Sequence, residues 1–397
     1  MPPLFDLDPK LVERVNRALA AINDGKMVIL VDDEDRENEG DLCMAADLVT
    51  PEAVNFMAMH ARGLICLTIT EEQVERLGLP MMQTPGRGGP PLGTAFTVSV
   101  EAKTGVTTGI SAADRAHTMR VASDPKCAPA ELVTPGHVFP LRAKSGGVLV
   151  RTGQTEGSVD LARMAGREPA GVICEIMNDD GSMARMPDLE RFAKKHGLIL
   201  LAIAELIEFR MQTERLVRRV SERDVVLDAT GTTWKAIVYE SSPSGRQVLA
   251  LVKGTLDGDE PIDCRMHSGS LLADTFASTG RDGGKNLRAA FRMIEAKGRG
   301  VVVYLPPGGD LAKEMAAHAA TPAAESDSES KPQLPEAAPL REYGIGAQVL
   351  ADLGLHKIRL LSNNPRRIAG IHGYGLDVVD CVPLEASSLP IPGESRP

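Results

Sequence analysis

The segment VILVDDEDRENEGDL, Val28–Leu42, sets the framework for the first half of the chain. Its apolar start predicts a buried strand over Met27–Val31. Seven of the ten residues in Asp32–Asp41 are acidic, and one cation, Arg36, lies among them. Carboxylates at this density repel one another, so the loop requires either a bound divalent cation or plain solvation as an offset.

Helices and strands alternate on both sides of this segment. The stretch DPKLVERVNRALAAINDG predicts a helix, because Asp8 can cap it, Pro9 fits its first turn and Gly25 follows it. A second helix is predicted from Thr50, and the spacing of SAAD at 111–114 predicts a capping box before another. Further strands are predicted at 64–70 (LICLTIT), 96–101 (FTVSVE), 146–151 (GGVLVR), 171–177 (GVICEIM) and 198–203 (LILLAI), with a loop at 83–93 and a helix at 186–197.

Length and composition narrow the classes of protein. A chain of 397 residues suggests two domains, and its 43% hydrophobic and 25% charged residues are globular values. The net charge of −10, without a block of Lys and Arg, argues against nucleic acid or an anionic membrane as partner. Six cysteines without a CxxC pair form neither a disulfide framework nor a zinc ribbon. The start MPPLFDLDPK has no secretory pattern and no apolar run reaches bilayer length, so we expect a cytoplasmic protein.

A change in pattern near Arg210 predicts domains at 1–210 and 212–390. The second half has strands at WKAIVYE and RQVLALVKG, and a helix, NLRAAFRMIEAKGRG, that leads into the strand VVVYLPP. Residues 319–339 are rich in Ala, Pro, Ser and Glu and are predicted to form a flexible insertion.

Three features of the first half suggest chemistry. The acidic loop suits Mg²⁺, which prefers oxygen ligands, and Arg36 has the fork that binds a phosphate or carboxylate. His137 follows Pro-Gly, which places it on a turn, where it is either an acid–base group or a surface histidine. The segment RTGQT, residues 151–155, follows a predicted strand and precedes a predicted helix. Arg151, Thr155 and the backbone N–H groups at the start of this helix could together bind a phosphate.

Two polar residues interrupt predicted apolar strands. Glu175 lies within GVICEIM and is either paired structurally or poised in a site, since burial raises the pKa of a carboxyl toward the range useful to a general base. Cys66 lies within LICLTIT, where a small core hydrophobe is the commoner outcome.

Together these segments resemble 3,4-dihydroxy-2-butanone 4-phosphate synthase of riboflavin biosynthesis. The similarity covers about residues 10 to 210, in order, through DDEDRENEGD, GLICLTIT, GVTTGISAADR, PGHVFPLRA, TEGSVDLARMAG and CEIMNDDGSMAR. The resemblance implies an α+β chain with a three-layer α-β-α synthase domain. It also implies a homodimer with sites at the dimer interface, and a lyase that uses Mg²⁺ or Mn²⁺ to convert ribulose 5-phosphate to the four-carbon phosphate and formate.

The resemblance also implies roles for individual residues. Arg36 and Glu37 would contact the sugar phosphate, with Glu37 also a metal ligand, and Asp41 would hold substrate hydroxyls. Arg151 and Thr155 would bind substrate near its phosphate. His137 and Glu175 stand at the positions essential for catalysis, and Asp32 and Cys66 would support them.

One departure from the family pattern affects the metal. The family usually has a histidine that ligates Mg²⁺ where this chain has Gln154. An amide oxygen is an acceptable ligand for Mg²⁺ but a neutral and weaker one, so the predicted metal ligands are Glu37 and, through its amide, Gln154.

The second half resembles GTP cyclohydrolase II, which implies a mixed α/β domain. The matching stretches are VLALVKG, RMHSGSLLADTF, GRGVVVYL, YGIGAQVLADLGLHKIRLLSNNP and DVVDCVPL. That cyclohydrolase requires three zinc cysteines, whose positions here read Ser270, Arg281 and Gly283. We therefore expect no zinc and no ring opening of GTP in this domain.

The main hypothesis is a formate-releasing lyase acting on ribulose 5-phosphate. A bifunctional enzyme with residual GTP cyclohydrolase II activity is the enzymatic alternative. A non-catalytic scaffold is the alternative from a different class, and Gln154 is the feature that supports it.

Overall fold

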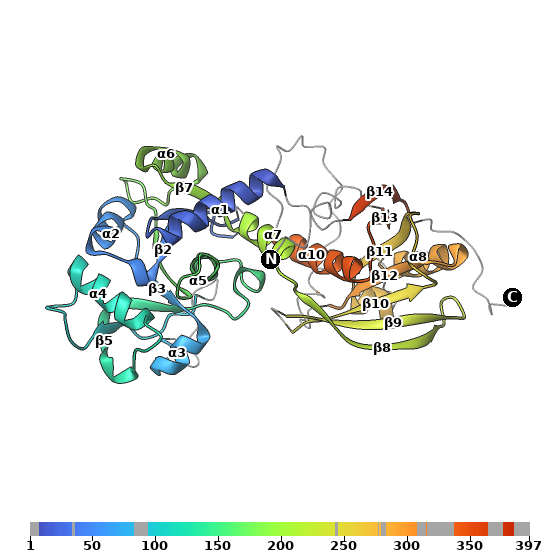
Figure 1. Ribbon diagram of the computed structural model, residues 1–397, viewed down its shortest axis with the longest axis horizontal. Helices are drawn as coiled ribbons and strands as arrows, with labels where there is room; N and C mark the ends of the chain where they lie inside the picture. The colour runs from blue at the N-terminus through green and yellow to red at the C-terminus, as the bar shows by residue number, and fades with distance from the viewer. Residues whose placement is uncertain are drawn as a thin grey trace. The chain divides into compact units, whose positions relative to one another are not determined.

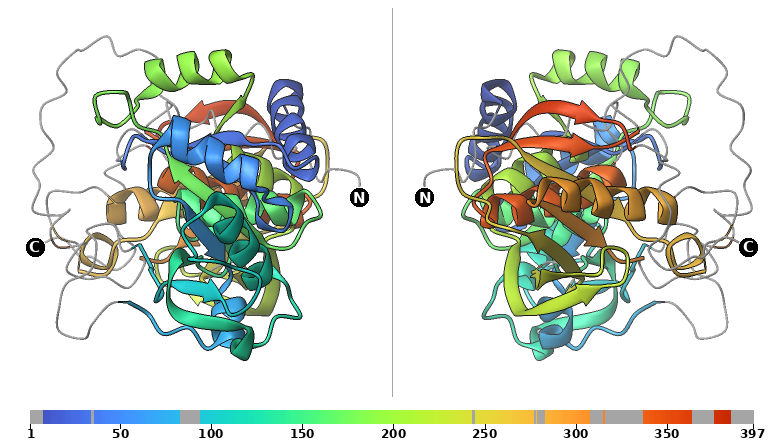
Figure 2. Two further views of the ribbon diagram at one scale, coloured as in Figure 1. Left: turned by 90° about the vertical axis from the view of Figure 1, so that its left-hand side faces the viewer. Right: turned by 90° about the vertical axis from the view of Figure 1, so that its right-hand side faces the viewer.

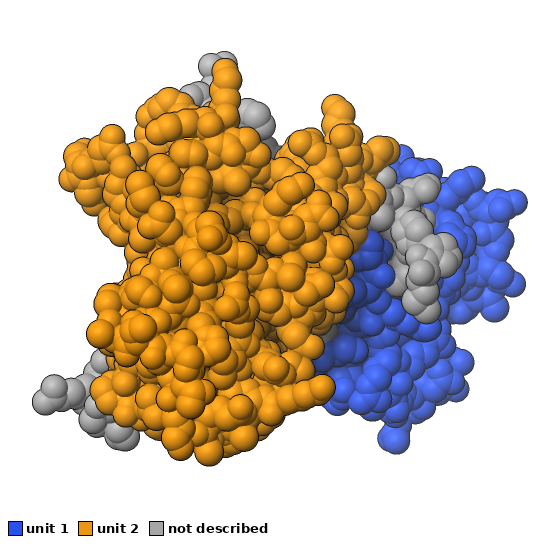
Figure 3. Space-filling view, turned by 60° about the vertical axis from the view of Figure 1, so that its left-hand side comes forward, with its two compact units in different colours: residues 1–7, 211–333, 338–397 blue, residues 8–210, 334–337 orange. Residues whose placement is uncertain are grey.

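The computed structural model describes residues 8–33, 36–82, 94–242, 245–276, 278, 283–307, 315, 337–363 and 376–384. The loop predicted at 83–93 and residues 319–336 of the predicted insertion lie outside this part of the chain. The chain divides into two compact units, coloured separately in Figure 3, which we call the N-terminal unit (8–210) and the C-terminal unit (from 211 onward). Among the described residues, no helix has the length and apolar character needed to span a membrane.

The N-terminal unit is built on a seven-stranded sheet with the order β4-β5-β3-β6-β2-β1-β7. The sheet is mixed: β1 is parallel to β7 and β3 to β5, whereas the β1–β2, β2–β6, β6–β3 and β4–β5 pairs are antiparallel. Its strands are β1 (Val28–Val31), β2 (Gly40–Ala45), β3 (Cys66–Ile69), β4 (Val100–Ala102), β5 (Leu132–Arg142), β6 (Ala170–Glu175) and β7 (Ile199–Ala202). Its α-helices are α1 (Pro9–Asn23), α2 (Pro51–Phe56), α3 (Glu71–Leu77), α4 (Ala112–Ser123), α5 (Gln154–Met164), α6 (Met186–His196) and α7 (Ile203–Thr213), the last of which runs on into the next unit.

Helices cover both faces of this sheet (Figures 1 and 2). Helices α1 and α5 pack on each other and on the central strands β1 and β2. On the opposite face, α2, α4 and α6 contribute Val54, Met119 and Leu189 to one apolar core with Ile29 and Leu42. The expected three-layer α-β-α arrangement is confirmed.

Local sequence signals account for most helix starts. Asp8 accepts a hydrogen bond from the backbone N–H of Lys10 at the start of α1, and Ser111 accepts one from Asp114 N–H at the start of α4. Helix α3 was not among the predicted elements, although Thr70 and Gln73 form a reciprocal capping box at its start.

Three predicted elements are corrected. The strand predicted at 96–101 is regular only from Val100, as β4, and Phe96 and Thr97 form isolated bridges. GGVLVR forms a 3₁₀ turn over Gly147–Leu149 instead of a strand, because Gly146 and Gly147 both have positive φ and turn the chain. The end of the acidic stretch is also not loop: β2 begins at Gly40, so Asp41 lies in a buried strand paired with β1 and β6.

The C-terminal unit has a second seven-stranded sheet, of order β14-β13-β11-β12-β10-β9-β8. Its strands are β8 (Val217–Leu227), β9 (Thr232–Ser241), β10 (Gln247–Lys253), β11 (Ile262–Ser268), β12 (Gly300–Leu305), β13 (Lys357–Leu361) and β14 (Asp377–Val382), and its long helices are α8 (Gly283–Lys297) and α10 (Ala337–Asp352). The strands and the helix expected from WKAIVYE, RQVLALVKG, NLRAAFRMIEAKGRG and VVVYLPP are all present.

The two long helices lie on opposite faces of the second sheet. Phe291 of α8 packs in a core with Trp234 and Val302. Gly346 of α10 lies against Met266, which is paired with Val303 and therefore faces away from Val302. The predicted mixed α/β domain is thus a helix-covered sheet.

Candidate active site

Five strands of the first sheet bring polar side chains to one edge. Register pairs Asp41 with Glu175 and Cys66 with Ile173, so the start of β2, the end of β6 and the start of β3 meet there. The end of β1 joins them because Val31 pairs with Gly40, and β5 approaches the same edge because Phe139 pairs with Cys66. Predicted site residues that are more than 100 positions apart in the sequence, such as Asp41 and Glu175, are therefore neighbours in space.

Asp32 organises the acidic loop. Its side chain is buried and accepts hydrogen bonds from the backbone N–H groups of Glu39 at 2.8 Å and Glu37 at 3.2 Å. It also accepts from Arg36 Nη1 at 2.5 Å. These bonds fold the loop back onto the start of β2. The supporting role expected for Asp32 in catalysis stays a prediction.

Arg36 links the acidic loop to helix α5. Its Nη1 lies 3.1 Å from the Glu37 carboxylate and donates to the amide oxygen of Gln154 at 2.9 Å. Gln154 is buried at the first position of α5. The oxygen that we expected to face a metal ion is therefore engaged by a guanidinium. An amide oxygen has a second lone pair, so this bond does not exhaust its capacity as an acceptor.

A second guanidinium lies at the start of α5. Arg151 Nη1 donates to the buried carboxylate of Glu156 at 2.7 Å. A methyl group placed on Gly153 would come within 2.6 Å of Arg151 Nη1 and 3.1 Å of Arg36 Nη2. Both cations thus gather over a bare Cα at the N-terminus of an 11-residue helix, beside Thr155. This arrangement suits an anion such as a phosphate.

Asp41 and Glu175 form a carboxyl pair across β2 and β6. Burial, and then the charge of Glu175, raise the pKa of Asp41 well above its ordinary value. Burial also raises the pKa of Glu175, although Leu64 N–H donates to its carboxylate at 2.8 Å. When two neighbouring carboxyl groups both have raised pKa values, one can remain protonated while the other is ionised near neutral pH. Such a pair is suited to supply an acid and a base.

The raised pKa of Asp41 predicts a stability effect with a definite sign. The folded chain holds this proton at pH values where the unfolded chain has lost it, so stability falls as pH rises above about 4. Asp41→Asn is expected to increase the free energy of unfolding at pH 7 by about 1 kcal/mol and to lose this advantage near pH 4. Thermal unfolding of the variant at both pH values measures the effect.

Asp114 is a matched control of opposite sign. It accepts hydrogen bonds from Thr107 and Gly109, and these lower its pKa to about 2. Its stabilising effect is present at neutral pH and is lost only as pH falls through that value. Asp114→Asn should therefore lower the unfolding temperature at pH 7. An equal change in both variants would contradict the account given for Asp41.

Cys66 lies at the same edge but is buried. Burial and the neighbouring Glu175 raise the pKa of its thiol, so the group remains protonated at neutral pH. A buried, protonated thiol is not set up to act as a nucleophile, and the supporting role expected for Cys66 stays a prediction.

His137 lies in a strand, and its predicted position on a turn is corrected. Strand β5 runs through it, but the pairing with β4 jumps: Val100 faces Val138, while Glu101 faces Val133. The residues between, 134–137, bulge out of the ladder, which explains why Pro-Gly reads as a turn in the sequence. The β5 backbone lies two strand spacings, about 10 Å, from that of β6, which carries Glu175.

Glu101 is the site residue that sequence reasoning missed. Its carboxylate lies 2.6 Å from His137 Nδ1. The signal was present in FTVSVE, where an acidic residue ends an alternating strand, but the partner lies 36 positions away. Nothing in the local pattern identifies that partner.

The donors at this edge fit a hard divalent cation in kind. Glu37 and Glu39 lie in the acidic loop and Asp41 lies at the start of β2. Repulsion between these carboxylates contributes to the raised pKa values of Glu39 and Asp41. Within the described residues, no three His, Cys, Asp or Glu side chains are already close enough to enclose a metal ion. Mg²⁺ needs only one or two protein carboxylates, because it retains several waters, so the donors present are sufficient.

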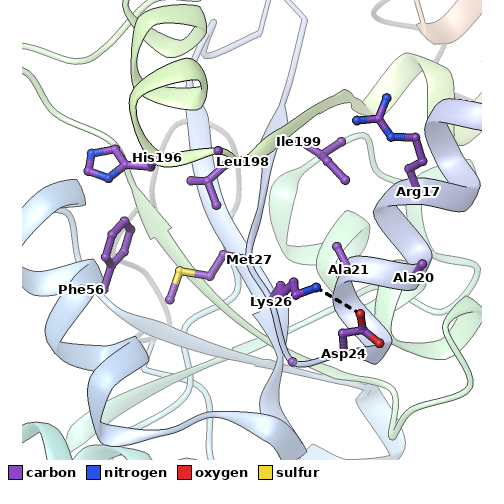
Figure 4. A pocket seen from close by; sticks show the side chains of 12 residues that line it. Arg17, Ala20, Ala21, Asp24, Lys26, Met27, Phe56, His196, Leu198 and Ile199 are labelled. Atoms are coloured by element: carbon purple, nitrogen blue, oxygen red, sulfur yellow. Dashed lines mark hydrogen bonds and ion pairs between the residues drawn. The ribbon is translucent and has the colours of Figure 1, made fainter.

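A cavity of about 680 Å³ lies apart from this edge (Figure 4). It is bounded by α1, the end of α2 and the turn from α6 to β7, and Phe56, His196 and Leu198 contribute to its wall. None of the catalytic, substrate-binding or metal-binding residues predicted from the sequence lines this cavity. It therefore plays no part in the site described above.

Comparisons with known proteins match the two halves of the chain to two different families. Residues 16–209 match the family model of 3,4-dihydroxy-2-butanone 4-phosphate synthase, and residues 218–383 match that of GTP cyclohydrolase II. Riboflavin biosynthesis protein RibBA of Aquifex aeolicus is 48% identical over 95% of this chain and 93% of its own. The chain belongs to the RibBA family of riboflavin biosynthesis proteins.

Two further proteins are similar to this chain over most of its length. A probable bifunctional riboflavin biosynthesis protein, RIBA 1, chloroplastic, of Oryza sativa is 45% identical over 96% of this chain and 71% of its own. The crystal structure of RibBX, a two-domain 3,4-dihydroxy-2-butanone 4-phosphate synthase from A. baumannii, is 39% identical, with a TM-score of 0.72 over 92% of this chain and 98% of its own. The expected synthase is thereby confirmed: the chain is a 3,4-dihydroxy-2-butanone 4-phosphate synthase, a lyase of riboflavin biosynthesis.

Proposed function

We propose that the N-terminal unit converts ribulose 5-phosphate to 3,4-dihydroxy-2-butanone 4-phosphate and formate at the sheet edge described above. The observation that carries the proposal is the meeting of two guanidiniums, at the start of α5, with a carboxyl pair across β2 and β6 that joins buried Asp41 to partly buried Glu175. A phosphorylated sugar needs both features, one for its phosphate and one for its proton transfers.

The phosphate would bind between Arg36, Arg151 and the N-terminus of α5. Arg36 is held by Asp32 and Gln154, and Arg151 by Glu156, so neither guanidinium has to be ordered when substrate arrives. Thr155, buried in the first turn of α5, would complete this subsite. Asp41 would hold the substrate hydroxyls farther along the same edge.

Glu175 and His137 would carry the proton transfers. The reaction removes a proton beside the substrate carbonyl, expels water, rearranges the carbon skeleton and releases one carbon as formate. Glu175 combines a raised pKa with a fixed orientation, since Leu64 N–H holds one of its oxygens, and so suits the role of base. Asp32 and Cys66 would support the loop and the strand without exchanging protons.

A divalent cation, Mg²⁺ or Mn²⁺, would be held by the Glu37 carboxylate and the Gln154 amide oxygen. When bound, it would stabilise negative charge that develops on neighbouring sugar oxygens. Glu37 is partly exposed, and Arg36 Nη1 contacts one oxygen of its carboxylate. The other carboxylate oxygen is therefore suited to bind the ion. Gln154 would face the ion with the lone pair that Arg36 does not use.

A formate assay beside the Gln154→His variant tests this proposal. The natural chain is expected to release formate from ribulose 5-phosphate, and Gln154→His is expected to lower the Mg²⁺ concentration for half-maximal activity by about tenfold, because it supplies the imidazole that the family usually has as a metal ligand at this position. Equilibrium binding of Mn²⁺ to both proteins gives a measure independent of turnover. Activity in the variant alone would show that the natural chain has lost its chemistry and would contradict the proposal.

A cytoplasmic homodimer is the assembly we propose. A second copy would bring another His137 and Glu175 into one assembly, which is relevant because β5 and β6 are two strand spacings apart in a single chain. Light scattering of the purified chain tests the dimer.

We propose further that the C-terminal unit has lost the cyclohydrolase reaction. Ser270 N–H donates to Asp274, and Ser270 Oγ accepts from Ala273 N–H, so this position serves a turn. His267 and Tyr304 contact the same Asp274 carboxylate at 3.1 Å. Of the cysteines in this unit, Cys264 is buried within the sheet, where burial raises its pKa. A set of cysteine thiolates able to bind zinc is thus missing from the described residues.

The match of residues 218–383 to the GTP cyclohydrolase II family model favours the alternative, a bifunctional enzyme.

A further inference from the structure

We propose that Glu101 is a positioning residue for His137, holding the imidazole in the tautomer that carries its proton on Nδ1 and presents Nε2 to substrate. The inference deepens the proposed function, since it rests on the role of His137 in the synthase reaction. It assigns a task to a side chain that the sequence motifs leave without one.

The contact between the two side chains is short and asymmetric. His137 Nδ1 lies 2.6 Å from Glu101 Oε2. The Glu101 side chain is 11% exposed, whereas that of His137 is 45% exposed. The Nδ1 edge of the ring therefore faces a buried carboxylate, while nearly half of the imidazole side chain remains exposed and Nε2 is the nitrogen that Glu101 does not engage.

The backbone brings these residues together in an unusual way. The register of β4 against β5 jumps between Val100 and Glu101, and residues 134–137 bulge outward at that step. Gly136 lies directly on the β4 backbone: a methyl group there would approach the carbonyl oxygen of Val100 to 2.0 Å. A larger residue at 136 would separate the strands and draw His137 away from Glu101.

A loop closes over the pair from the other side. A methyl group on Gly109, whose φ is +88°, would lie 2.1 Å from Glu101 Oε2 and 2.5 Å from His137 Nδ1. Gly109 N–H donates to Asp114 at 3.0 Å, and Asp114 also accepts from Thr107 N–H and Oγ1. The loop is thus fixed by a buried carboxylate of its own. The contact is built from three segments and is not a chance meeting of surface side chains.

The chemistry of imidazole gives this contact a consequence. A carboxylate only accepts hydrogen bonds, so it favours the ring in which Nδ1 carries the proton and Nε2 has the lone pair. Nε2 is then the atom able to take a proton from substrate. Glu101 would also stabilise the positive charge that the ring acquires, without itself exchanging a proton with substrate.

Substitution of Glu101 in the full chain tests the inference. In Glu101→Gln the amide both donates and accepts, so the tautomer is no longer fixed. We expect kcat for formate release to fall about 10²-fold with KM changed less than about threefold. Glu101→Asp retains the carboxylate and should recover most of that loss. Glu131→Gln, which removes a charge at the exposed turn before β5, is the matched control and should leave kcat unchanged.

A second measurement separates this inference from the proposed function. In ¹⁵N spectra of histidine-labelled protein, His137→Asn identifies the His137 signals, and Glu101→Gln is expected to shift them away from the pattern of an Nδ1-protonated ring. Unchanged signals in Glu101→Gln would overturn the inference whatever the activity. Shifted signals with full activity in both Glu101→Gln and His137→Asn would instead remove His137 from the reaction, and the positioning role with it.

Discussion

Glu175→Gln is expected to lower kcat for formate release by about 10³-fold while the chain remains folded. The amide matches the carboxylate in size but cannot take a proton from the carbon beside the substrate carbonyl. The bond from Leu64 N–H can still be accepted by the amide oxygen, so the end of β6 should keep its geometry. Initial rates over a range of ribulose 5-phosphate concentrations separate the fall in kcat from any change in KM.

Two variants control for the removal of charge. Glu190→Gln removes an exposed carboxylate from α6 and should leave the rate unchanged. Asp41→Asn removes the other carboxyl group of the pair, and it should reduce the rate while raising stability at neutral pH. Full activity in Glu175→Gln would show that the base lies elsewhere, and the assignment of the carboxyl pair would fail.

Local signals were sufficient where one segment determines its own structure. The start of α1 follows from Asp8 and Pro9, and the buried strand β1 follows from an apolar run that ends at the acidic loop. The motif residues Asp32, Arg36, Asp41 and Glu175 also came together at one edge. Patterns of three to ten residues contain this information because capping and burial act over that range.

Long-range pairing explains what the sequence did not reveal. Strand β2 looks like the end of an acidic loop until its pairing with β6 buries Asp41 against Glu175. The bulge at residues 134–137 depends on the register between β4 and β5, and the partner of His137 depends on the same register. The bond from Arg36 to Gln154 spans 118 positions, so no local pattern predicts that the amide oxygen meets a guanidinium.

The purified chain is expected to retain less than about one tenth of a zinc ion per molecule and to leave GTP intact. Ring opening of GTP needs a metal-activated water, and zinc in such sites requires cysteine or histidine ligands. Ser270, Arg281 and Gly283 supply neither. Metal analysis after dialysis, together with release of formate from GTP, measures both expectations.

The triple variant Ser270→Cys, Arg281→Cys, Gly283→Cys is the positive control for the zinc measurement. It restores thiolate ligands at three positions of the C-terminal unit and leaves every residue of the synthase site unchanged, so formate release from ribulose 5-phosphate should remain at the level of the natural chain. Stoichiometric zinc in the natural chain, or conversion of GTP by it, would show that other ligands have replaced the cysteines. Conversion of GTP would make the chain a bifunctional enzyme, because the residues of the synthase site all lie in the N-terminal unit.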